Sequence, residues 1–155
     1  MAARFLFLGI GNPHRGDDAA GPRLAERLRE NKTLKSLHVD IVDHGGEGVS
    51  LMDLWEGAQK TVIVDAMKSG AAVGTVKRFD ANVDRLGGGT FHYSSHLFSL
   101  AEAVELARQL NRLPQELVVY GIEGRAFEFG APLSPEVEAA LAEVEVRIER
   151  EFADA

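Results

Sequence analysis

The chain has 155 residues, no cysteine, and 24 acidic against 17 basic residues, which gives a formal net charge of −7. The lack of cysteine excludes thiol nucleophiles, cysteine-ligated zinc and iron–sulfur clusters, and the negative charge argues against nucleic acid as the main partner. We expect a single domain over residues 1–155. The sequence shows neither the pattern of a signal peptide nor the ~20 apolar residues of a membrane span, so we expect a cytoplasmic protein without a membrane partner.

A strand, a glycine-containing turn and a helix open the chain. Residues 5–8 (Phe-Leu-Phe-Leu) form an apolar run too short for a helix, which predicts a buried strand. The turn GIGNPHRGDDAAG follows at residues 9–21, and apolar residues then recur at helical spacing. Because glycine has no Cβ, Gly9 and Gly11 let the backbone approach a ligand closely. Such junctions form the sites of open α/β sheets.

The Gly-x-Gly pair in this turn also raises the possibility of dinucleotide binding. The third glycine of that fingerprint is replaced by His14, however. The acids Asp17 and Asp18 stand at the mouth of the following helix, where they would compete with a phosphate for the backbone amides. One of them could cap the helix, which leaves the other for a different role.

Strands and helices are predicted to alternate along the rest of the chain. Further strands are expected at residues 37–42, 61–66 and 117–122, and a polar strand, at an edge or antiparallel, at 75–79. Helices are expected at 49–55, from about residue 94 or 95 to 110, and from Pro135 with Ser134 as N-cap. This order predicts a three-layer α/β/α sandwich with a mostly parallel twisted sheet. The irregular stretch 80–95, with glycines at 87–89, predicts a lid or binding loop.

Two acids and a histidine are expected to meet at one edge of this sheet. Asp18 follows the first strand and Asp65 ends the most apolar one, and the carboxyl ends of parallel strands lie at the same edge. His96, near the start of a helix, can reach that edge as well. Two carboxylates and an imidazole bind a borderline divalent ion and leave positions open, so zinc, nickel, cobalt and iron(II) all fit by ligand type. Three further histidines in nearby loops stay open as alternatives: His14, His44 and His92.

No serine lies in a Gly-x-Ser-x-Gly context, which disfavours a serine hydrolase. An acid placed directly after a buried strand, as Asp65 is, is costly unless something pairs with it. The residues therefore favour attack by water with help from a carboxylate and a metal ion.

Together these motifs resemble the hydrogenase maturation proteases. The likeness rests on Gly9-Ile10-Gly11-Asn12, Asp17-Asp18, Asp65-Ala66 and His96-Leu97, and continues through 121–137 over nearly the whole chain. It implies a phosphorylase/hydrolase-like fold and an endopeptidase that removes the C-terminal extension of the nickel–iron hydrogenase large subunit. The segment 43–48, Asp-His-Gly-Gly-Glu-Gly, departs from the Asp-Gly-Gly-Thr-x-Gly often found in that family.

The resemblance also implies roles for single residues. Asp18, Asp65 and His96 are implied as the metal-binding and catalytic set, with nickel carried by the precursor and no organic cofactor. The implied partner is the large-subunit precursor, and we expect a monomer. Candidates for substrate or loop contacts are Gly9, Gly11, Asn12, Asp17, Gly45, Gly46 and His92. A checkpoint protein that binds the nickel-loaded precursor without cutting it would use the same residues. The Gly-x-Gly-Asn-Pro opening also resembles that of peptidyl-tRNA hydrolases, but the negative net charge disfavours that function.

Overall fold

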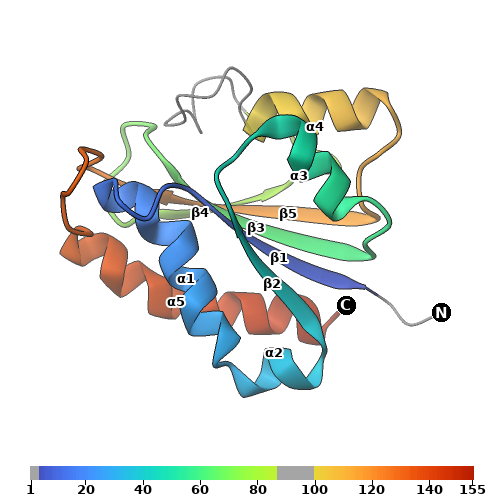
Figure 1. Ribbon diagram of the computed structural model, residues 1–155, viewed down its shortest axis with the longest axis horizontal. Coiled ribbons are helices and arrows are strands. Elements are labelled where there is room, and N and C mark those ends of the chain that lie inside the picture. The colour runs from blue at the N-terminus through green and yellow to red at the C-terminus, as the bar shows by residue number, and fades with distance from the viewer. Residues whose placement is uncertain (1–3, 87–99) are drawn as a thin grey trace.

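The computed structural model describes residues 4–86 and 100–155, in which a five-stranded sheet lies between two layers of helices (Figure 1). The strands run in the order β2-β1-β3-β5-β4. Their bounds are β1 Phe5–Ile10, β2 Val39–His44, β3 Lys60–Met67, β4 Val76–Asp80 and β5 Glu116–Glu123. All neighbours pair in parallel except β4, which is antiparallel to β5 at the edge. The predicted three-layer sandwich with a mostly parallel sheet is thus confirmed, including the edge position of the polar strand.

Helices cover both faces of the sheet (Figure 1). One face carries α1 (Ala20–Arg29), α2 (Lys32–Ser36) and α5 (Pro135–Ala153), and the other carries α3 (Gly48–Trp55) and α4 (Leu100–Gln109). Every residue of the central strand β3 is buried, because its alternate side chains enter the two apolar cores. The apolar, β-branched run at 61–66 therefore predicted the central strand correctly.

The second strand begins later than predicted, at Val39 instead of residue 37. Residues 32–36 form the helix α2, which was not predicted, and residues 37–38 form a turn. Its N-cap is Asn31, whose side chain accepts a hydrogen bond from the Leu34 N–H at 3.0 Å. His38 then takes a positive φ of 57° between the helix and the strand. Five residues are too few to show a helical period, so only the asparagine cap signalled this helix.

Two other expectations fall on residues that the structure does not describe. The helix expected from residue 94 or 95 is described from Leu100 onward, as α4. The proposed lid around glycines 87–89 lies outside the described residues. Within the described ranges, no helix is long and apolar enough to cross a bilayer.

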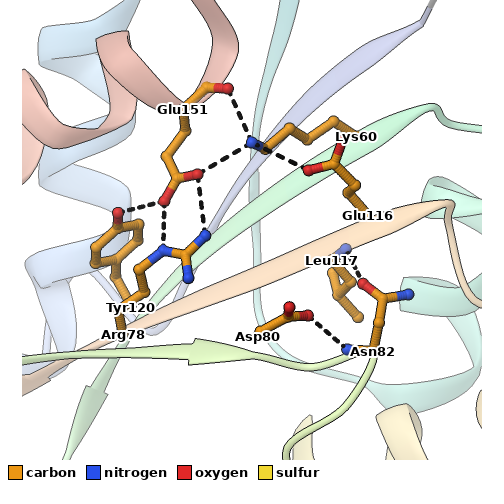
Figure 2. A network of polar contacts seen from close by, with 8 residues as sticks. All are labelled: Lys60, Arg78, Asp80, Asn82, Glu116, Leu117, Tyr120 and Glu151. Atoms are coloured by element: carbon orange, nitrogen blue, oxygen red, sulfur yellow. Dashed lines mark hydrogen bonds and ion pairs between the residues drawn. The ribbon is translucent and has the colours of Figure 1, made fainter. Parts of the chain in front are cut away.

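A partly buried ionic network fixes the C-terminal end of α5 to the sheet (Figure 2). The Glu151 carboxylate accepts hydrogen bonds from Lys60 Nζ at 3.0 Å, from Arg78 Nε at 2.7 Å and from the Tyr120 hydroxyl. Burial would raise the pKa of Glu151, but these donors lower it to about 2. Because Lys60 begins β3, this network lies at the amino edge of the parallel strands, opposite the edge where the predicted site lies.

Candidate active site

The start of α1 packs directly on the end of β1, and glycines make this possible. A Cβ on Gly9 would lie 2.2 Å from the Gly21 carbonyl oxygen, and one on Gly11 would lie 1.9 Å from the carbonyl oxygen of Asp18. Gly11 also has a φ of +144°, which favours glycine. Between them and the helix, Gly16–Ala19 form a 3₁₀ turn. These two candidate glycines therefore hold the turn close to the strand, which brings Asp18 to the sheet edge.

The Asp17 side chain is fully buried and tied to a distant part of the chain. Its carboxylate accepts hydrogen bonds from the N–H groups of Arg125 (2.7 Å), Ala126 (3.0 Å) and Ser134 (2.6 Å), and from Ser134 Oγ (2.7 Å). Burial would raise the pKa of Asp17, but these donors lower it below its usual value. Asp17 thus joins the β1–α1 turn to the β5–α5 loop. Ser134 precedes α5 as predicted, but its hydroxyl donates to Asp17 and does not cap the helix.

Asp18 has a different environment from its neighbour. Its side chain is nearly buried, and Oδ2 accepts the Asn12 N–H at 2.9 Å. Burial raises its pKa, against the opposing effects of that N–H and of the Arg15 charge. The N-cap of α1 is Ala19 and has no side-chain capping bond. Neither acid caps this helix, so the alternative role considered for them does not hold.

Asp65 lies close to the Asp18 carboxylate at the carboxyl edge of the sheet. β3 neighbours β1, with Gly9 opposite Val64, so the ends of the two strands are adjacent. Burial raises the pKa of Asp65 well above its usual value, and the negative charge of Asp18 raises it further, while the Ala66 N–H opposes both. Two buried carboxylates that repel each other are stabilised by a cation bound between them. The structure therefore brings together two of the three predicted ligands.

The third predicted ligand, His96, and the alternative His92 lie outside the described residues, so their place at this edge stays a prediction. Among the described residues, no three side chains of metal-binding type form a group. Asp65 points to the same face of β3 as Ile63 and Met67, which pack in the core under α3 and α4. Its side chain therefore belongs to the face that α4 covers.

A cavity of about 390 Å³ opens beside the turn. Residues 11–14, Pro22 and residues 43–45 line it, so it lies between the loops that follow β1 and β2. The His44 ring on its wall is held on both sides: Nδ1 accepts the Gly46 N–H at 2.8 Å and Nε2 bonds with Ser50 Oγ at 2.9 Å. The predicted residues Gly11, Asn12 and Gly45 are thus part of a cavity wall, while Gly46 orients His44.

Glu123, for which no role was predicted, is buried at the end of β5. Its carboxylate accepts the Ser69 N–H at 3.0 Å, Ser69 Oγ at 2.7 Å and the Gly70 N–H at 3.3 Å. These bonds fix the loop that follows β3, the strand that carries Asp65. The available signal was the same as for Asp65: an acid directly after an apolar strand.

The chain is similar in sequence to proteins of hydrogenase maturation. The family described as HycI, hydrogenase maturation protease, matches residues 22–151. The chain is 32% identical over 138 residues to the hydrogenase expression/formation protein HupD of Thiocapsa roseopersicina, which covers 88% of this chain and 62% of that relative. It is 31% identical over 140 residues to the hydrogenase 2 maturation protease of Escherichia coli, covering 89% of this chain and 84% of the relative. The chain thus spans less than two thirds of the first relative and most of the second.

The fold is similar to that of a solved peptidase. The structure of the hydrogenase maturating endopeptidase HybD from Escherichia coli aligns with a TM-score of 0.72 and 25% identity, and the alignment covers 96% of this chain and 93% of that one. The similarity therefore extends over both chains almost completely.

Proposed function

Since this chain belongs to the hydrogenase maturation protease family, a family of peptidases, we propose that it removes the C-terminal extension of a nickel-loaded hydrogenase large-subunit precursor. The observation that carries the proposal is the pair of buried carboxylates, Asp18 and Asp65, at the carboxyl edge of the sheet. Burial raises the pKa of both, and the charge of Asp18 raises the pKa of Asp65 further. Structural acids are stabilised by donors, as Asp17 is. At Asp18 and Asp65 the donors do not offset the effect of burial, so this pair suits a cation. We propose that the protein acts as a cytoplasmic monomer.

The nickel ion in this proposal belongs to the substrate. We propose that Asp18, Asp65 and His96 complete the coordination of the nickel already installed in the precursor, and that no organic cofactor takes part. His96 precedes Leu100 by four positions, and α4 covers the face of the sheet on which Asp65 lies. A set of three protein ligands leaves positions for groups of the precursor. Coordination shared in this way lets the processed product leave.

The chemistry requires a water molecule and a proton carrier. The water oxygen attacks the carbonyl carbon of the scissile bond, a carboxylate takes the proton of the water, and the same proton passes to the departing amine. Asp18 or Asp65 supplies that carboxylate, since both lie at the carboxyl edge of the sheet. Nickel either polarises the carbonyl or only positions the precursor.

The test is incubation with a nickel-loaded and a nickel-free precursor, followed by measurement of intact mass. We expect loss of the C-terminal extension from the nickel-loaded form alone, and no cleavage by the Asp18→Asn, Asp65→Asn or His96→Ala variants. Asp40→Asn is the matched control, because Asp40 is an exposed acid paired with Arg4 on the surface. Retained binding of the nickel-loaded precursor without any change in its mass would show the non-cleaving checkpoint instead. No interaction with either form would contradict both functions.

A further inference from the structure

Phe129 is an apolar side chain that is largely exposed in the described part of the chain. It is 76% exposed, and it is the one aromatic residue among the large apolar side chains that are exposed there; the others are Val49, Val83, Leu110 and Val146. Single exposed aliphatic residues are ordinary. Aromatic side chains are enriched at protein interfaces, where they supply a large contact area.

The loop that carries Phe129 is fixed at both ends and in the middle. Asp17 accepts hydrogen bonds from Arg125 and Ala126 at the start of the loop and from Ser134 at its end. In between, the Gly130 N–H donates to the His14 carbonyl oxygen at 2.8 Å. An aromatic side chain on backbone that is already ordered loses little conformational entropy when it binds a partner.

The loop places Phe129 on a path that leads to the candidate site. Its ring centroid lies 6.2 Å from that of His14. The His14 N–H donates to Asn12 Oδ1 at 2.9 Å, and the Asn12 N–H donates to Asp18 Oδ2 at 2.9 Å. His14 and Asn12 also line the cavity of about 390 Å³. The exposed ring therefore lies beside one wall of the cavity, and hydrogen bonds connect that wall through Asn12 to Asp18.

We propose that Phe129, packed beside His14, is a specificity-determining contact for the precursor: it binds a large aliphatic or aromatic side chain in the peptide segment that leads away from the scissile bond. This inference rests on the proposed function. The hydrogen-bonded link from His14 through Asn12 to Asp18, at the wall of the cavity, assigns this contact to the substrate.

The test uses the full chain and a nickel-loaded hydrogenase large-subunit precursor, and it measures binding and cleavage separately. Phe129→Ser should raise the dissociation constant and KM about tenfold, the scale of one interface aromatic, with kcat and the melting temperature unchanged. Phe129→Tyr keeps the aromatic ring, so its dissociation constant and KM should stay close to those of the wild type. The control is Val83→Ser, because Val83 is 75% exposed and lies far from the candidate site. Val83 follows β4 at the amino edge of the sheet, where the Ala81 N–H donates to the Leu117 carbonyl oxygen. The dissociation constant and KM of this variant should therefore equal the wild-type values.

The outcomes separate this inference from the proposed function. Wild-type cleavage with the same KM in Phe129→Ser would overturn the role of Phe129 and leave the peptidase function standing. If the precursor binds more weakly to Phe129→Ser, but neither the wild type nor any variant cleaves it, the contact is supported and the peptidase function is overturned. Equal weakening in Phe129→Ser and Val83→Ser would also overturn the inference, because the effect would then be one of general surface hydrophobicity.

Discussion

The carboxylates of Asp17 and Asp18 are adjacent in the chain, yet they are held by different parts of the molecule. Asp17 receives four hydrogen bonds from the loop that precedes α5, and its pKa is lowered. Asp18 receives one from Asn12, lies near Asp65, and has a raised pKa. The first acid is therefore stabilised by the fold, whereas the second is destabilised by it. Functional residues commonly carry such a cost.

The two neighbours should respond oppositely to the same substitution. Asp17→Asn places an amide among N–H and O–H donors and removes charged hydrogen bonds, so we expect a loss of about 2–4 kcal/mol in the free energy of unfolding. Asp18→Asn removes a buried charge that repels Asp65, so its unfolding free energy should be unchanged or higher. Urea denaturation at neutral pH without added metal measures both. Equal losses in the two variants would contradict this division of roles.

Asp65→Asn distinguishes a catalytic acid from a packing residue. The variant keeps the shape of the side chain and removes a charge that burial and Asp18 both disfavour. We expect an unchanged or raised melting temperature at neutral pH, together with loss of precursor processing. Both are measured on one preparation. A variant that melts early and still cleaves the precursor would make Asp65 structural.

Replacement of Gly9 by alanine should destabilise the protein, whereas the same replacement at Gly45 should not. Gly9→Ala would place a Cβ 2.2 Å from the Gly21 carbonyl oxygen, which is backbone and cannot move aside, so we expect a loss of about 3 kcal/mol or more, or failure to fold. At Gly45 the nearest atom to a new Cβ is the flexible Glu47 Oε1, at 3.3 Å. Gly45→Ala should therefore melt like the wild type. Thermal denaturation of the two variants is the measurement, and a stable Gly9→Ala protein would show that α1 can shift away from β1.

The sequence revealed those features that depend on local periodicity. The apolar run at 61–66 predicted the central strand, and the positions of Asp18 and Asp65 after two strands predicted that they would meet. It could not separate Asp17 from Asp18, because the donor that distinguishes them, Ser134, lies 117 positions away. It also missed the role of Glu123, because that role depends on the course of the loop at Ser69. Contacts between loops far apart in sequence leave no periodic signal.

The network around Glu151 should govern acid stability. Because the pKa of Glu151 is lowered from 4.5 to about 2, its contribution is fully present above pH 4.5 and is lost as the pH falls toward 2. That shift corresponds to about 3 kcal/mol. Glu151→Gln should therefore lower the unfolding free energy at pH 7 by up to about this amount, and its difference from the wild type should shrink between pH 4.5 and 2.

The matched control for this prediction is Glu138→Gln on the same helix. Glu138 pairs with Arg23 at 3.8 Å, and its side chain is 52% exposed. An exposed pair of this kind contributes at most about 1 kcal/mol, so the control should track the wild type at every pH. The measurement is urea denaturation at several pH values from 7 to 2.5. A Glu151→Gln protein whose deficit stays constant over that range would show that the carboxylate stabilises α5 by packing, because a charge interaction with Lys60 and Arg78 must weaken as the carboxylate takes up a proton.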